Sequence, residues 1–204
     1  MKEIIIGTTN PAKLEQLRGA IEPLGLTVCE ISADIVLPKV VEDGKTALEN
    51  AEKKALVYAK LIGKNVLSMD NALYFDGVQT EEQPGLNVRR IKGFDNIGTD
   101  SELLAYYSAL IEKLGDRIGG HWEYGVCLAT PTGEKYGTTI ISPRIFISKA
   151  SSTVVAGYPL ESIQIDPKTK KYISEMSKEE QNLFWQKNIG KELVSFIKSI
   201  NIIN

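Results

Sequence analysis

The chain has 204 residues, 43% of them hydrophobic and 25% charged, so we expect a single domain over residues 1–204 with a buried core. The formal net charge of −2 lacks the basic bias of a protein that binds a nucleic-acid polymer. Two cysteines are too few for a disulfide framework, no apolar run approaches the ~20 residues of a membrane span, and the first residues do not resemble a signal peptide, so we expect a cytoplasmic protein without a membrane partner.

The first predicted elements are a strand, a tight loop and a helix. An apolar run at residues 4–7 is followed by a polar stretch at 8–13. Apolar residues then recur at helical spacing, at Leu14, Leu17 and Ile21. Asn10 is a favourable N-cap, and Pro11 suits the first helical position, so the helix is predicted to begin there.

The polar stretch is a candidate phosphate site. The start of the predicted helix offers free N–H groups and the positive end of its dipole. The hydroxyls of Thr8 and Thr9 can donate to phosphate oxygens, and Lys13 adds a cation in the first turn. The same pattern also fits an ordinary β–α turn with a surface lysine, so the residues alone leave both interpretations open.

A second strand with its exit is predicted over residues 26–37 and ends before Pro38, followed by an acidic loop at 42–45 and a long helix. Thr46 and Glu49 form a capping box, and an alanine-rich stripe at i, i+4 spacing continues to about Gly63. Asn50 and Lys54 are also four residues apart, so both side chains can reach one place. Glu49 and Lys53 have the same spacing, and for them we expect a solvated ion pair.

Asp70 is the candidate reactive carboxylate. It follows the apolar pair at residues 66–67, which predicts a short buried strand with Asp70 at its end. Carboxylates at strand ends serve as metal ligands and general bases in α/β sites. An aspartate that caps a turn is an equal alternative on spacing alone.

The remaining pattern mixes helices with hairpins. Residues 79–100 are polar and turn-rich, which predicts a loop and a candidate lid, and a helix is predicted over 103–115. Strands are predicted at 122–129, 135–141, 144–147, 153–156 and 163–165. A capping box at Ser177 opens a final helix that is interrupted near Gly190. This order predicts an α/β fold other than a purely parallel Rossmann sheet.

Several spaced motifs follow one another in a defined order. They are Thr8-x-Asn10-x-x-Lys13, Glu42-Asp43-Gly44-Lys45-Thr46, Glu49-Asn50-Ala51-x-x-Lys54-Ala55, Asp70, Pro84-Gly85 with Arg90, and Glu175-Met176-Ser177-x-Glu179-Glu180. Together they resemble the inosine triphosphate pyrophosphatase (ITPase) family, which clears deaminated purine nucleotides.

The resemblance implies an ITPase-like α/β fold, with two lobes around a long, bent mixed sheet flanked by helices and a central cleft. It implies Mg²⁺-dependent hydrolysis of a nucleoside triphosphate, with aberrant purine nucleotides such as ITP or XTP as substrates, to monophosphate and pyrophosphate. It also implies a homodimer.

The resemblance also implies roles for individual residues. Asp70 and Lys54 would be catalytic, with Asp70 orienting the attacking water and Lys54 neutralising phosphoryl charge. Asp70 and Glu42 would hold Mg²⁺. The substrate-binding residues would be Thr8, Thr9, Asn10, Lys13, Asn50, Arg90 and Lys187.

The departures from the family pattern fall where the family recognises the base. Met69 replaces the first Asp of its "D-D-S-G" motif, and residues 155–160 replace "G-F-G-Y-D-P". Gln181 replaces a late Lys, and residues 185–187 replace "S-H-R". Trp185 can stack on a base, although an anchor for the last helix is the preferred interpretation. The alternatives to the main hypothesis are therefore a relative with a changed base preference and a catalytically impaired nucleotide-binding module.

Overall fold

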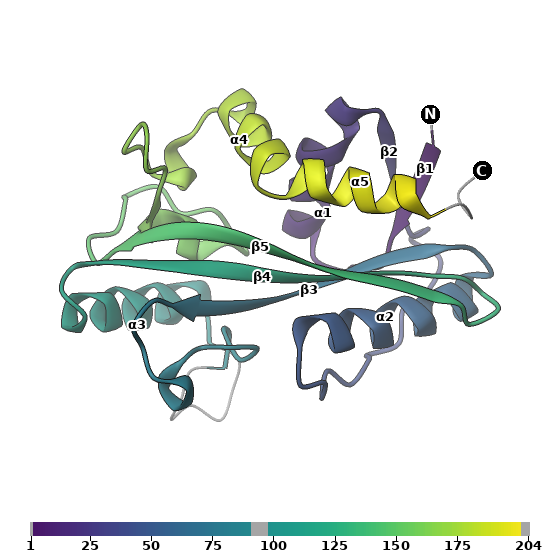
Figure 1. Cartoon of the computed structure of the whole chain (residues 1–204), viewed down its shortest axis with the longest axis horizontal. Coiled ribbons are helices and arrows are strands. Elements are labelled where there is room, and N and C mark those ends of the chain that lie inside the picture. Colours follow the sequence, from purple (N-terminus) through teal and green to yellow (C-terminus); the bar gives the residue numbers. More distant parts are fainter. Residues whose placement is uncertain (1, 91–97, 201–204) are drawn as a thin grey trace. The chain divides into compact units, whose positions relative to one another are not determined.

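The computed structural model describes residues 2–90 and 98–200 (Figure 1). The strands are β1 (Lys2–Ile6), β2 (Leu26–Glu30), β3 (Val66–Phe75), β4 (Arg117–Ala129), β5 (Lys135–Ile147) and β6 (Gln164–Ile165). The helices are α1 (Pro11–Ile21), α2 (Ala47–Ile62), α3 (Asp100–Lys113), α4 (Lys178–Trp185) and α5 (Lys191–Ser199). Residues 91–97, in the middle of the predicted loop and candidate lid, lie outside the described residues.

The strands form one mixed sheet in the order β2-β1-β3-β4-β5-β6. β1 pairs in parallel with β2 and β3, whereas β5 pairs antiparallel with β6. This confirms the prediction of an α/β fold that is not a parallel Rossmann sheet. The chain divides into two compact units, and β3, β4 and β5 each contribute residues to both.

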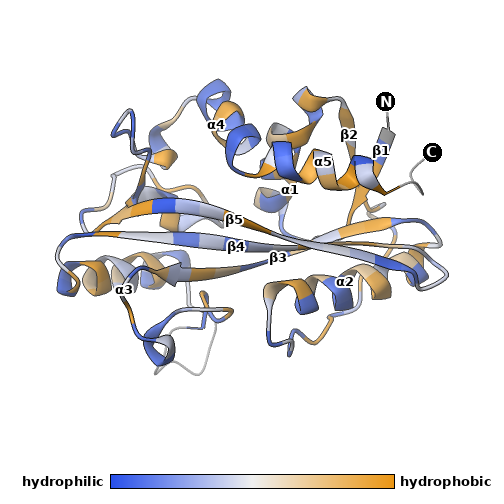
Figure 2. Cartoon of the chain, in the orientation of Figure 1, coloured by the Kyte–Doolittle hydropathy of each residue, from blue (hydrophilic) through white to orange (hydrophobic). Residues whose placement is uncertain are grey.

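The first unit comprises Met1–Asn71, Glu123–Ile140 and Asn182–Asn204. Within it, α1 packs against β2, α5 and the π-helical turn η5 (Gln186–Gly190) (Figure 1). Figure 2 shows hydrophilic and hydrophobic residues distributed along α2, as expected for a helix with one buried side. Its apolar side forms a core cluster with two strands, made of Ala51, Ala55, Tyr58, Ala59, Val66, Cys127 and Ala129.

Gly125 of β4 lets the start of α2 lie directly on the sheet. A Cβ atom at Gly125 would lie 2.1 Å from the carbonyl carbon of Ala47 and 2.1 Å from the amide nitrogen of Leu48. These are backbone atoms, so a larger side chain would displace the first turn of the helix. Because Gly125 has no side chain, the first turn of α2 can pack directly against β4, and this contact sets the position of the polar residues on the helix.

The second unit comprises Ala72–Trp122 and Ile141–Gln181. Its core cluster contains Leu73, Phe75, Leu103, Tyr107, Ile111, Phe146, Leu160 and Ile163. The helix α3 begins with a capping box between Thr99 and Glu102, and Ser177 and Glu180 form the predicted capping box before α4.

Five strand predictions need correction. β2 ends at Glu30, so Ile35–Leu37 lie in a loop, and β3 is a ten-residue strand with Asp70 inside it. The two predicted strands on either side of Pro143 are one strand, β5. Residues 153–156 form no strand, and Val155 makes only an isolated bridge to Tyr158. β3 extends beyond the predicted strand because the sequence does not show that Asp70 is paired with lysines from two helices.

Neither cysteine is in a disulfide: Cys127 is buried and Cys29 is half-buried. Within residues 2–90 and 98–200, no helix is both long enough and apolar enough to span a lipid bilayer.

Glu161, in the short 3₁₀ helix η3 (Pro159–Ile163) of the second unit, is a buried acid with only 6% of its surface exposed. Burial raises the pKa of its carboxyl group to about 7, although the charge of Arg144 opposes this shift. The folded state therefore binds the proton more tightly than the unfolded chain between the usual glutamate pKa and about pH 7.

Stability is thus expected to fall as the pH rises through that window, by roughly 3 kcal/mol from this group. Glu161→Gln should remove that part of the slope, since glutamine does not titrate. Urea titrations of both proteins at about pH 5 and pH 8 measure the difference. Equal losses of stability in the two proteins between these pH values would contradict the raised pKa.

Candidate active site

The loop between β1 and α1 is ordered by its own polar side chains. The Asn10 side-chain oxygen accepts a hydrogen bond from the Ala12 N–H at 3.0 Å, which confirms the predicted N-cap. The Thr8 hydroxyl oxygen accepts from the Asn10 N–H at 3.1 Å, while Thr9 is exposed. These hydrogen bonds fix the backbone at the start of α1, and the first turn of this helix carries Lys13.

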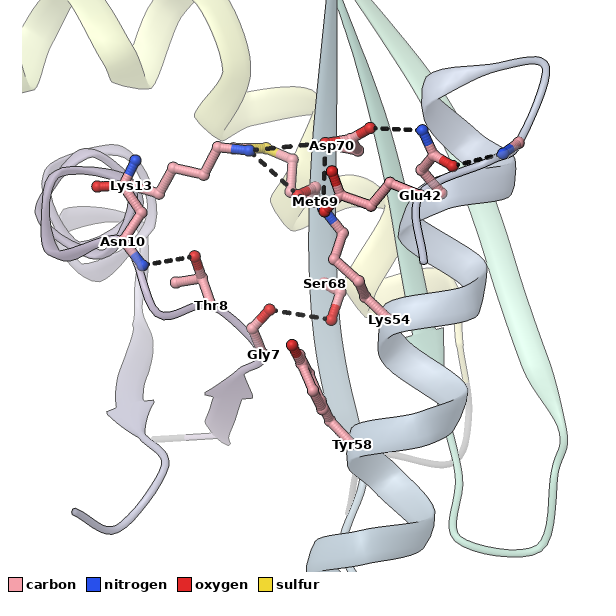
Figure 3. A network of polar contacts seen from close by, with 12 residues as sticks. Gly7, Thr8, Asn10, Lys13, Glu42, Lys54, Tyr58, Ser68, Met69 and Asp70 are labelled. Carbon is pink, nitrogen blue, oxygen red and sulfur yellow. Dashed lines mark hydrogen bonds and ion pairs between the residues drawn. The ribbon is translucent and has the colours of Figure 1, made fainter. Parts of the chain in front are cut away.

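The same loop is tied to β3 just before Asp70. β1 pairs with β3 only at Val66 and Leu67, because β1 ends at Ile6. The Gly7 N–H then donates to the Leu67 carbonyl at 2.8 Å, and the Ser68 hydroxyl donates to the Gly7 carbonyl at 3.2 Å (Figure 3). Asp70 thus lies just beyond the carboxyl end of β1, although it is inside β3 and not at the strand end that the sequence predicts.

Two lysines from different helices converge on Asp70 (Figure 3). The Lys54 ammonium, from α2, lies 3.0 Å from Asp70 Oδ1 and 3.3 Å from the Met69 carbonyl oxygen. The Lys13 ammonium, from α1, lies 3.3 Å from the same carbonyl and 4.0 Å from Asp70 Oδ1. Both lysine side chains are largely buried, at 17% exposed for Lys13 and 11% for Lys54.

The ammonium groups of the two lysines repel each other. Burial, and then repulsion from Lys54, lower the pKa of Lys13 to about 8, while Asp70 and Glu42 act in the opposite direction. An anion with several charges would relieve this repulsion. The arrangement therefore favours a phosphate-like ligand between the start of α1 and the middle of β3.

The acidic loop before α2 completes the cluster from the other side. Glu42 Oε1 lies 3.0 Å from the Lys54 ammonium, so one nitrogen bridges Glu42 and Asp70. Asp43 pairs with Lys53, and the Lys45 N–H donates to Glu49 Oε2 at 2.7 Å. The expected ion pair between Glu49 and Lys53 is therefore wrong: each of them binds this loop, which folds back along the helix.

Asn50 is also part of the cluster but is enclosed by it. It is 3% exposed, its amide nitrogen donates to Asp70 Oδ2 at 3.0 Å, and its amide oxygen accepts from the Gly44 N–H at 2.8 Å. The helical spacing of Asn50 and Lys54 brings both side chains to one place, as the sequence predicts, and the structure shows that this place is Asp70. Both ends of the Asn50 amide already have partners within the protein, so its position suits holding Asp70 better than contacting a substrate.

Two further predicted substrate-binding residues are Lys187 and Arg90. Lys187 is exposed on η5, and none of the contacts described for residues 2–90 and 98–200 links it to Asp70 or to the two lysines. Arg90 belongs to the second unit, where it is exposed in a turn closed by its N–H and the Asn87 carbonyl. Trp185 is 7% exposed and packs edge-on against Phe184, which confirms its interpretation as an anchor of the last helix.

Two backbone groups of the cluster could not be predicted from the sequence. The Met69 carbonyl accepts hydrogen bonds from Lys13 and Lys54, and the Gly44 N–H donates to the Asn50 side-chain oxygen. Every residue has such groups, so the residue type gives no signal for them. Only the absence of a side chain at Gly44 hints at a close approach.

The chain is similar to known proteins in both sequence and fold. A model of the Ham1 family matches residues 4–188. The chain is 27% identical over 179 residues to a protein of Geobacter sulfurreducens named dITP/XTP pyrophosphatase, over 79% of this chain and 88% of the relative. It is 32% identical over 134 residues to a protein of the same name from Exiguobacterium sp., over 65% of each. A solved HAM1 protein from Coxiella burnetii has the same fold, with a TM-score of 0.74 at 19% identity over 98% of this chain and 100% of that one.

Proposed function

The chain belongs to the Ham1 family, and on this premise we propose that it is a hydrolase that cleaves nucleoside triphosphates to monophosphates and pyrophosphate. The preferred substrates would be non-canonical purine nucleotides, because the relatives in Geobacter and Exiguobacterium are named dITP/XTP pyrophosphatases. The observation that carries this proposal is the convergence of Lys13 and Lys54 on Asp70 beside the start of α1.

In the proposed reaction, a water oxygen attacks the α-phosphorus of the substrate. The bond from this phosphorus to the oxygen that bridges it to the β-phosphorus breaks, and pyrophosphate leaves with the electron pair. Asp70 orients the water and accepts its proton, as a positioned carboxylate does in general-base catalysis. Lys54 lies against Asp70 Oδ1 at 3.0 Å and is placed to neutralise charge that develops on the phosphoryl oxygens.

The phosphates would lie over the loop between β1 and α1. Lys13 supplies a cation there, the hydroxyls of Thr8 and Thr9 donate hydrogen bonds, and Asn10 keeps the loop and the first turn in place. Arg90 and Lys187 remain proposed contacts for substrate oxygens, on the strength of the family resemblance alone.

The residues of the cluster fit a divalent metal ion. Asp70 and Glu42 meet at the Lys54 ammonium, and their carboxylates are the hard oxygen donors that Mg²⁺ prefers. Among the described residues no group of three or more His, Cys, Asp and Glu side chains is arranged for a metal, so water and phosphate oxygens would complete the coordination. When bound, the ion would neutralise phosphate charge. We propose Mg²⁺ for this role.

Further parts of the proposal come from the resemblance and the composition. The enzyme would act as a homodimer in the cytoplasm, without a nucleic-acid or membrane partner. Both compact units would act as one functional domain, which is supported by the family match across residues 4–188, with segments of each.

Pyrophosphate release from a panel of nucleotides with Mg²⁺ tests the proposed function. The panel contains ITP, dITP, XTP and the common ribo- and deoxyribonucleoside triphosphates. We expect turnover that is fastest on the deaminated purines. A fast reaction on other bases would indicate that the departures at 155–160 and 185–187 changed the base preference. Binding without turnover on any member would leave a nucleotide-binding module, and the absence of both would end the proposal.

A further inference from the structure

Asn50 connects two parts of the cluster that are otherwise separate in the chain. It lies in the first turns of α2, its amide nitrogen contacts Asp70 on β3, and its amide oxygen contacts the backbone of Gly44 in the acidic loop. Its side chain is almost completely buried, at 3% exposed. A substrate could reach neither end of the amide without displacing one of these partners.

The two partners determine which way the amide points. The Gly44 N–H can only donate, and the Asp70 carboxylate can only accept, so the amide oxygen must face Gly44 and the NH₂ group must face Asp70. The opposite orientation would place two donors together and two acceptors together. Asparagine offers both a donor and an acceptor on one short planar group, whereas aspartate at this position would lack the donor.

The contact with Asn50 orients the Asp70 carboxylate. The terminal torsion of an aspartate has broad, roughly two-fold preferences, so hydrogen bonds must fix the direction of its oxygens. Asn50 holds Oδ2 at 3.0 Å, while Oδ1 lies 3.0 Å from Lys54 and 4.0 Å from Lys13. Rotation of the carboxylate would break a buried hydrogen bond, which is costly. The plane of the carboxylate is therefore fixed, with one oxygen toward Asn50 and the other toward the two lysines.

The contact with Gly44 fixes the loop that carries Glu42. A Cβ atom on residue 44 would lie 2.7 Å from the Asn50 side-chain oxygen and 3.1 Å from the Asn50 backbone nitrogen, so the loop approaches this closely only with glycine. Glu42, two residues earlier, lies 3.0 Å from Lys54. Asn50 thus holds the backbone of the acidic loop and the carboxylate of β3 in one arrangement.

We propose that Asn50 is a positioning residue for hydrolysis. It acts through Asp70, whose Oδ1 it aims at the reacting water, and it does not touch the substrate. The inference rests on the proposed function, because the direction of Asp70 matters for turnover only if Asp70 acts on the water.

Asn50→Asp separates the two contacts. The aspartate keeps an acceptor for the Gly44 N–H, but it loses the donor for Asp70 and places a like charge beside it, so the Asp70 carboxylate is no longer held. We expect kcat to fall about 10- to 100-fold, the effect typical of losing a residue that orients a catalytic group, with KM changed by less than about threefold. Asn50→Ala removes both contacts and should lower kcat at least as much.

Thr46→Ala is the matched control. Thr46 caps the same helix through the Glu49 N–H and does not contact Asp70. This variant should lower the melting temperature, as loss of an N-cap does, with kcat close to that of the wild type. A loss of activity caused merely by loosening the start of α2 would appear in Thr46→Ala as well.

Hydrogen exchange of the Gly44 amide gives a readout that does not depend on activity. It should be faster than in the wild type in Asn50→Ala and unchanged in Asn50→Asp, which retains the acceptor. A low kcat with a protected Gly44 amide in Asn50→Asp would therefore assign the loss of rate to Asp70.

Three outcomes would overturn the inference: an Asn50→Asp variant with wild-type kcat, one in which only KM rises, or a Thr46→Ala variant that loses as much activity. A wild-type protein that hydrolyses no nucleotide would instead end the proposed function, and the catalytic role of Asn50 with it. The two failures are thus distinguishable.

Discussion

Replacement of Asp70 by asparagine is expected to lower kcat about 10²- to 10⁴-fold, the range typical for loss of a positioned general base. Asparagine has nearly the same shape and can still accept a hydrogen bond from Asn50, so the fold of the cluster should persist. It cannot take a proton from water, and it removes a negative charge beside the proposed phosphate site. Binding of a non-hydrolysable triphosphate without metal should therefore be as tight as in the wild type or tighter.

Steady-state pyrophosphate release and calorimetric binding of the analogue measure the two effects separately. Asp43→Asn is a matched control, because it makes the same chemical change in the neighbouring loop, where Asp43 is exposed and pairs with Lys53. Its kcat should stay within about twofold of the wild type, since a surface ion pair contributes little. A kcat for Asp70→Asn that stays near the wild-type value would remove Asp70 from the mechanism.

Local features of the site could be predicted from the sequence because they depend on residues that are close in the chain. The cap at Asn10 needs only its own side chain and the start of the next helix, and the capping position of Thr46 is equally local. The i, i+4 spacing of Asn50 and Lys54 placed both side chains on one side of α2. Helix geometry alone then directs them to a common point.

The surroundings of Asp70 could not be predicted in the same way. Its partners Lys13 and Lys54 come from two different helices, so nothing near Asp70 in the sequence indicates that its charge is compensated. In the sequence, where those partners are not visible, a charged residue predicts the end of a strand. With them, β3 continues to Phe75.

The sequence also does not determine which charged side chains pair with each other. Glu49 and Lys53 are ideally spaced for each other, but the loop before α2 folds back and offers Asp43 and the Lys45 N–H as partners. Such surface pairs differ little in energy, so the path of the loop decides which ones form. That path depends in turn on the close approach of Gly44 to Asn50.

Lys54→Met is expected to lower kcat about 10²- to 10³-fold, the loss typical when one charge-stabilising donor is removed from a transition state. The variant also leaves Asp70 and Glu42 without the cation that bridges them. Lys53→Met is the control, because it removes the same charge one residue earlier on α2, where Lys53 is 42% exposed and pairs with Asp43. Its kcat should remain close to that of the wild type.

The same variant has an expected effect on the pH dependence of binding. Burial is the main reason that the pKa of Lys13 lies at about 8, and repulsion from Lys54 is the second. In the wild type, affinity for a triphosphate analogue without metal should fall as the pH rises through about 8, where Lys13 loses its charge. In Lys54→Met this fall should move to higher pH, because the repulsion is gone while the burial remains. Calorimetric titrations across this pH range, with Lys53→Met alongside, measure the shift. An equal shift in both lysine variants, or in neither, would show that the two ammonium groups do not share one anion site.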